Sequence, residues 1–185
     1  MSEPRLFLAL KLPPNFLKRL EEYQNQLDQK YFKIIPLNQL HLTLLFLGET
    51  PLEKVEPLKQ VIERMAADFQ PSPLIFETIE YGPFLSNPRL IWLKGIPNSS
   101  FINFKTQLRN EIQKELKLDL SADQQVFLPH ITLARFKNHF ATPLPPLPDS
   151  SFFHHFSFVP NQLWLIQSIL HKTGPQYFDL AQFKL

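Results

Sequence analysis

The tetrapeptide pattern His-x-Thr-Leu occurs twice, in LHLTLLFLGE at residues 40–49 and in LPHITLARFK at residues 128–137. With average residue usage this pattern is expected at roughly one position in ten thousand, so composition alone does not explain two copies. Each copy opens an apolar run of the kind that forms a β-strand. The fold must therefore contain two similar β-strands that are far apart in the sequence, each with the motif at its start.

Strand geometry gives the pattern a meaning. Alternate residues of a strand share a face, so we expect His41 and Thr43 to point the same way, as His130 and Thr132 do. The apolar residues between them fall on the opposite face and can anchor each strand in the core. Two such strands facing each other would place two imidazoles and two hydroxyls around one small volume.

That set of groups suits phosphoryl chemistry without a metal or a cofactor. An imidazole has an ordinary pKa of about 6.5, so one ring can act as a base and the other as an acid near neutral pH. The threonine hydroxyls can donate to the phosphate oxygens on which charge develops. A 2′,3′-cyclic phosphate needs only a water activated on one side and a departing ribose oxygen protonated on the other. A single His-x-Thr is more often a polar strand edge or a satisfied core histidine, but the matched pair favours a site.

Composition excludes several other classes of function. The 4 glycines are too scattered for a Gly-rich phosphate loop, and the absence of cysteine excludes disulfides, thiolate metal sites and a cysteine nucleophile. A formal charge of +2 is too small for a broad duplex-binding surface but compatible with a local groove for a polyanion. No signal peptide or membrane span is recognisable, so we expect a cytoplasmic protein with no membrane partner. We also expect a monomer.

Hydrophobic periodicity predicts an α+β protein formed by a single domain, residues 1–185. Helices are expected around Phe16–Leu27, Val55–Phe69 and Phe101–Leu116. Besides the second motif, strands are expected at Arg5–Lys11, Leu40–Leu47, Leu74–Tyr81, Leu90–Leu93, His154–Phe158, Leu163–Leu170 and Tyr177–Leu185. The segment ATPLPPLPDSS is typical of a proline-rich surface loop rather than a linker between domains.

With both motifs in view, the sequence resembles the 2H phosphoesterase superfamily. It is most similar to the bacterial and archaeal RNA 2′,3′-cyclic phosphodiesterases, also called 2′-5′ RNA ligases. RLFLAL at residues 5–10, PRLIWL at residues 88–93 and the C-terminal SILHKTGPQYFDLAQFKL extend the likeness over nearly the whole chain. The resemblance implies two pseudo-symmetric lobes, each an antiparallel sheet with helices outside, around a central cleft.

The resemblance also implies metal-independent hydrolysis of RNA 2′,3′-cyclic phosphate ends, or of short oligonucleotides, to 2′-phosphomonoesters. By analogy His41 would be the proton donor to the leaving oxygen and His130 the proton acceptor from water, while Thr43 and Thr132 hold the phosphate. The residues alone do not assign which histidine is the acid. The alternatives are a 2′-5′ RNA ligase, a related phosphodiesterase of small cyclic nucleotides, and a non-enzymatic nucleotide- or RNA-binding module. The intact motifs argue against the last.

One departure from the family concerns charge. The residue after the first His-x-Thr-Leu is often arginine or lysine in these relatives, but here it is Leu45. Alternation predicts that Leu45 shares a face with His41, so a cation is missing there. Arg135 follows the second motif; alternation places it opposite His130 unless a bulge turns the strand. Contact with phosphate and a surface or interlobe salt bridge both remain open for Arg135.

Aromatic residues and the remaining histidines complete the candidates. Tyr177 is a candidate for stacking on an RNA base, and Phe7 and Trp92 are predicted to pack mainly in the core. His154 and His155 are adjacent, so in a strand they point to opposite faces and do not predict a metal site.

Overall fold

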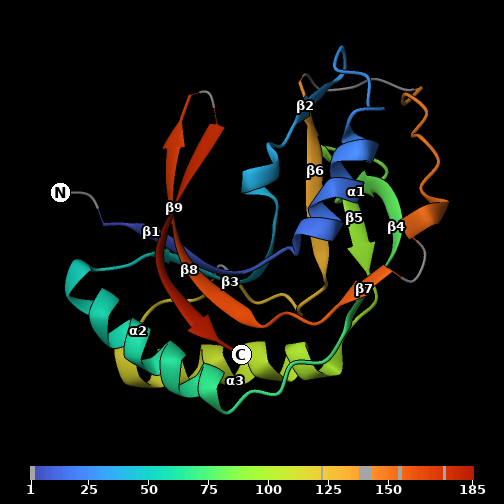
Figure 1. The fold of residues 1–185 in the computed structure, drawn as a ribbon. Helices are drawn as coiled ribbons and strands as arrows, with labels where there is room; N and C mark the ends of the chain where they lie inside the picture. Colours follow the sequence, from blue (N-terminus) through green and yellow to red (C-terminus); the bar gives the residue numbers. More distant parts are fainter. Residues whose placement is uncertain (1–2, 122, 138–142, 154–155, 173) are drawn as a thin grey trace.

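The structure of the chain is a computed structural model that describes residues 3–121, 123–137, 143–153, 156–172 and 174–185. Nine strands in these residues form two antiparallel sheets, with strand orders β3-β1-β8-β9 and β2-β6-β5-β4-β7. The expected α+β class, with two antiparallel sheets and external helices, is confirmed (Figure 1). The strands are β1 Arg5–Lys11, β2 Phe32–Ile34, β3 His41–Glu49, β4 Leu74–Gly82, β5 Leu90–Gly95, β6 His130–Phe136, β7 Phe156–Phe158, β8 Gln162–His171 and β9 Gly174–Lys184. The α-helices are α1 Pro14–Gln24, α2 Leu52–Ala67 and α3 Ser99–Leu116.

The chain passes between the two sheets several times. The four-stranded sheet joins β1 and β3 to the C-terminal strands β8 and β9, whereas β2 pairs with β6 in the five-stranded sheet. Helices α2 and α3 lie side by side below the four-stranded sheet, and α1 lies against β6 of the other sheet (Figure 1). The two motif strands, β3 and β6, belong to different sheets and contact each other. The two copies of the His-x-Thr-Leu pattern are thereby brought together.

Burial explains why β1 lies inside its sheet. Its side chains alternate between two apolar layers: Leu6, Leu8 and Leu10 enter the main core, while Phe7 and Ala9 form a small second cluster with Ile166. Covered on both faces, β1 is a continuous apolar run without polar alternation. The second cluster lies on the same face of the sheet as the first motif.

The first motif strand contains a β-bulge that changes which residues face the motif histidine. Leu8 of β1 pairs with Leu45, but the next residue pairs with Thr43, so Leu44 is an extra residue in β3. Leu45 is consequently 0% exposed, and Phe46 is 52% exposed. The predicted position of Leu45 beside His41 is wrong, because strict alternation does not hold across the bulge.

A matching bulge occurs in the second motif strand. Ile91 of β5 pairs with Ala134 and the following residue pairs with Thr132, so Leu133 is the extra residue in β6. Leu133 and Ala134 are both buried, and the alternation then resumes one residue out of phase. Arg135 is thereby turned toward the side of His130. Phe46 and Arg135 occupy corresponding positions in the two strands.

Within the described residues, none of the helices has the length and apolar character that crossing a bilayer requires.

Candidate active site

Both motifs line one cleft between the two sheets. The cleft has a volume of about 840 Å³, and its walls include His41 and Thr43 from β3 and His130 and Thr132 from β6. All four side chains are half-buried, so they are shielded but still accessible. The structure brings together the four residues that the repeated pattern singled out.

The two imidazoles are held in the same way. Nδ1 of His41 lies 2.6 Å from the carbonyl oxygen of Gln39, and Nδ1 of His130 lies 2.8 Å from that of Leu128. A carbonyl can only accept, so Nδ1 carries the proton and donates in both rings. In each neutral ring Nε2 is then the nitrogen with a free lone pair. In both cases the carbonyl belongs to the residue two positions before the histidine. The backbone just before each motif strand therefore orients the imidazole ring.

Aromatic rings pack behind and beside the histidines. The Phe7 ring centroid lies 5.1 Å from that of His41, and Tyr177 meets His41 edge-on at 5.3 Å. Trp92 lies 5.0 Å from His130, and its indole N–H donates to Glu80 at 3.3 Å. Phe7 is 3% exposed, as expected for a core residue, although it also contributes to the cleft wall. Trp92 is half-buried and supports His130 without lining the cleft.

Burial lowers the pKa of both motif histidines below the ordinary imidazole value. For His41 the main cause is desolvation of the charged ring, and the charges of His130 and Lys11 lower the pKa further. For His130 the main cause is again burial, with a contribution from Lys105. In both cases the hydrogen bond to the backbone carbonyl opposes the shift. Because a charge on His130 disfavours a proton on His41, the state with both rings protonated is disfavoured.

A buried ion pair supports the first motif strand. Lys105 of α3 and Asp123 are 8% and 6% exposed, and their Nζ and Oδ1 atoms lie 2.5 Å apart. Oδ2 of Asp123 accepts a hydrogen bond from the backbone N–H of Phe46 at 2.6 Å. Lys105 also donates to the carbonyl of Gln125 at 2.9 Å. Asp123 thus stabilises the part of β3 that follows the bulge.

A buried glutamine has the corresponding position at the second motif strand. Gln24 of α1 is 4% exposed, and its Nε2 donates to the carbonyl oxygens of Ile35 and Leu133 at 2.8 Å each. Leu133 is the extra residue of the β6 bulge. The bulge that turns Arg135 toward the cleft is therefore held by a side chain far away in the sequence.

Further residues line the cleft wall, and the sequence had indicated only some of them. Arg135 and Tyr177 were candidates, and both line the cleft. Lys33, Arg5 and Phe46 line it too but were missed, because no local pattern marks them as part of a site. His171 is exposed and lies at the cleft.

Among the described residues, no three His, Asp or Glu side chains lie close enough together to hold a metal ion. His154 and His155, for which the sequence predicts no metal site, lie outside the described residues.

Comparison with known proteins agrees with this geometry. The family model of the 2′-5′ RNA ligase superfamily matches residues 12–167, which include both motifs. This chain belongs to that superfamily. The superfamily is the one that the two His-x-Thr motifs predicted.

The similarity to individual proteins extends over nearly the whole chain. A curated RNA 2′,3′-cyclic phosphodiesterase of Thermus thermophilus is 32% identical over 185 residues, covering 98% of this chain and 90% of the relative. The crystal structure of TT0787 of Thermus thermophilus superposes with a TM-score of 0.81 at 32% identity, covering 98% and 97% of the two chains. The crystal structure of Escherichia coli LigT complexed with 3′-AMP gives a TM-score of 0.72 at 25% identity, covering 99% and 98%. The predicted fold class is therefore confirmed by solved structures.

Proposed function

We propose that this chain hydrolyses the 2′,3′-cyclic phosphate at RNA ends to a 2′-phosphomonoester, with two imidazoles and without a metal ion. The observation that carries the proposal is the cleft in which both His-x-Thr pairs meet, each histidine with Nδ1 bound to a carbonyl. Curated relatives named RNA 2′,3′-cyclic phosphodiesterase support the same activity.

In this proposal the reaction is a single in-line displacement at phosphorus. Nε2 of His130 takes a proton from water as the water oxygen bonds to phosphorus. The bond from phosphorus to the 3′-oxygen breaks, and Nε2–H of His41 protonates the leaving oxygen. The product carries a 2′-phosphate and a 3′-hydroxyl. Proton exchange with solvent then returns His41 to its protonated form and His130 to its neutral form.

Hydroxyl groups stabilise the charge on the cyclic phosphate, and a cation helps to bind the substrate. Thr43 and Thr132 lie on the histidine faces of their strands and donate to the non-bridging oxygens. The bulge in β6 brings Arg135 to the same cleft, where it acts as a substrate-binding cation. Tyr177 lines the cleft on the opposite sheet and contributes an aromatic surface for the nucleoside.

The proposal is tested with purified protein, EDTA and a short RNA that ends in a 2′,3′-cyclic phosphate. We expect cleavage to persist in EDTA, and phosphorus NMR to show a 2′-monoester. His41→Ala and His130→Ala should each reduce kcat by at least about 10²-fold, the contribution of one general acid or base. His171→Ala is the matched control, since this histidine also lines the cleft but lies outside the motifs. Tight RNA binding without turnover, or activity that survives either motif substitution, would overturn the proposed mechanism.

Ligation is a second candidate function, favoured by the description of the family that the chain matches. A 5′-hydroxyl of another RNA can replace water as the nucleophile, and loss of the same 3′-oxygen then yields a 2′-5′ phosphodiester. Adding an RNA with a 5′-hydroxyl to the assay distinguishes the two outcomes. A 2′-5′ linked product of summed length indicates ligation, whereas the 2′-monoester alone indicates hydrolysis.

A further inference from the structure

Positive charge is concentrated at the end of the cleft formed by β2 and β6. Lys33 of β2 and Arg135 of β6 are directly opposite each other in the antiparallel ladder. Directly opposite residues point to the same face of a sheet, and both side chains line the cleft. The register thus places two cations side by side.

This arrangement favours the binding of an anion. Like charges directly opposite each other across a ladder are destabilising. Arg5 adds a further cation to the cleft wall, while Asp and Glu do not occur among the described residues that line it. Arg135 has no ion-pair partner among the described residues. A bound anion would offset the repulsion.

The position of the pair relative to the motif threonines indicates which anion it would bind. Arg135 follows Thr132 by three residues, but the bulge at Leu133 makes this only two ladder steps. Two steps of about 3.3 Å give roughly 7 Å along the strand. That is the order of the distance between the 3′-side and 5′-side phosphates of one nucleotide. A cyclic phosphate held by the threonines therefore brings the next phosphate of the chain within reach of these cations.

The start of β9 closes the same end of the cleft from the other sheet. A Cβ atom at Gly174 would lie 3.4 Å from Nζ of Lys33, so the ammonium group reaches this strand. Gly174 has a φ of +128°, which favours glycine, and the position leaves room beside Lys33. Tyr177 lies close enough to Arg135 for the guanidinium charge to act on its hydroxyl, opposing the rise in its pKa that burial causes. A ligand between β2, β6 and β9 would be held from both sides.

Building on the proposed function, we propose that Lys33 and Arg135 form a second phosphate subsite for the 5′-phosphate of the terminal nucleotide. In an RNA chain this group is the phosphodiester that joins the last nucleotide to the one before it. The enzyme would then prefer RNA ends to nucleoside 2′,3′-cyclic phosphates that lack a 5′-phosphate.

The first experiment compares three substrates: a nucleoside 2′,3′-cyclic phosphate, a dinucleotide ending in the same cyclic phosphate, and that dinucleotide with an uncharged methylphosphonate linkage. We expect kcat/KM for the charged dinucleotide to exceed that of its methylphosphonate analogue by at least about tenfold, which corresponds to about 1.4 kcal/mol. The advantage should shrink as salt is added, because it depends on a phosphate contact. Equal kcat/KM values for the charged and uncharged dinucleotides would overturn the inference.

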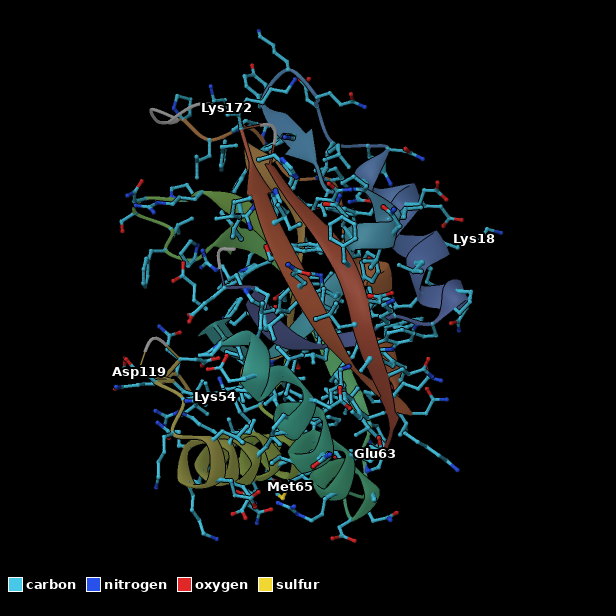
Figure 2. All side chains as sticks on the ribbon, turned by 90° about the vertical axis from the view of Figure 1, so that its left-hand side faces the viewer. Lys18, Lys54, Glu63, Met65, Asp119 and Lys172 are labelled. Atoms are coloured by element: carbon cyan, nitrogen blue, oxygen red, sulfur yellow. The ribbon has the colours of Figure 1, made fainter. Side chains whose placement is uncertain are left out.

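Variants connect this preference to the proposed residues. Lys33→Gln should reduce the ratio of charged to uncharged dinucleotide activity toward one. Lys18→Gln is the matched control, because Lys18 is an exposed lysine on α1 that lies outside the cleft lining (Figure 2). It should leave the ratio unchanged. A ratio that survives in Lys33→Gln would assign the preference to other residues and overturn the subsite.

A binding measurement separates this inference from the proposed function. Calorimetry compares a nucleoside 2′,5′-bisphosphate with the 2′-monophosphate, and no turnover is needed. We expect the bisphosphate to bind at least about tenfold more tightly, and Lys33→Gln to remove most of the difference. Equal affinities would refute the subsite even if hydrolysis is confirmed. Tighter bisphosphate binding without any hydrolysis would support the subsite and overturn the proposed function.

Discussion

Replacing Asp123 by asparagine removes one charge from the buried ion pair beneath the first motif strand. The carboxylate is 6% exposed and lies 2.5 Å from Nζ of Lys105, which is itself 8% exposed. Asparagine keeps the size of the side chain and one oxygen to accept from the N–H of Phe46. The main loss is therefore the compensation of the Lys105 charge. Breaking a buried pair by removing one partner costs about 3–5 kcal/mol.

That cost is a large part of the roughly 5–15 kcal/mol by which a domain is stable. At about 2–4 °C per kcal/mol for a protein of this size, Tm should fall by roughly 6–20 °C. Urea denaturation followed by the fluorescence of the 2 tryptophans measures the free energy of unfolding directly. Asp119→Asn is the control, since Asp119 is an exposed aspartate of the same loop (Figure 2) and its replacement should have a much smaller effect.

The double variant with Lys105→Met separates charge burial from packing. If the uncompensated ammonium group is the cause, Asp123→Asn with Lys105→Met should be more stable than Asp123→Asn alone, because neither charge then remains buried. A loss below about 1 kcal/mol in Asp123→Asn, or strictly additive losses in the double variant, would refute this reasoning.

Three further predictions concern the motif strands. The pKa values of His41 and His130 are lowered in the folded state, chiefly by burial, so the unfolded chain binds more protons as the pH falls. The contribution of these two residues to the free energy of unfolding should therefore be fully present above about pH 6.5 and decrease at lower pH. Urea midpoints at about pH 7.5 and 5.5 test this, and substituting glutamine for either histidine should reduce the difference. Leu45→Arg should abolish folding or cost several kcal/mol because Leu45 is 0% exposed, whereas Phe46→Arg at a 52% exposed position should fold; equal thermal stability of the two variants would contradict the bulge. Gln24→Leu removes two hydrogen bonds worth about 0.5–1.5 kcal/mol each, so it should lower the free energy of unfolding by about 1–3 kcal/mol in a urea titration, although the carbonyl of Leu133 still accepts from the N–H of Ile35; an unchanged midpoint would argue against the two hydrogen bonds.

The site residues of the repeated pattern were predictable because their placement is local. His41 and Thr43 are two positions apart on one strand, so period-two geometry is enough to put them on one face. The same holds for His130 and Thr132. The apolar runs after each motif predicted the strands themselves, and the structure places both motifs in one cleft.

The prediction from strand alternation was wrong at Leu45, four residues after His41, and at Arg135, five residues after His130. Each strand contains one extra residue there relative to its hydrogen-bonded neighbour, which a single strand's sequence cannot reveal. The bulges are supported by side chains that are distant in sequence: Gln24 bonds to Leu133, and Asp123 to Phe46. A buried glutamine or aspartate has no strand or helix periodicity that would mark this role.

The cations of the cleft also separate what the local sequence specifies from what only the tertiary structure decides. The repeated pattern determined which polar groups share a strand face, because an imidazole and a hydroxyl two residues apart on a strand point the same way. Arg135 and its neighbour Lys33 acquired their positions only from the tertiary structure, since β2 pairs with β6 across a long stretch of chain. The register of that pairing, together with one bulge, decides that two like charges lie side by side at the cleft. Register depends on the packing of the whole sheet, so local sequence specifies which groups are present but not where the second set of charges lies.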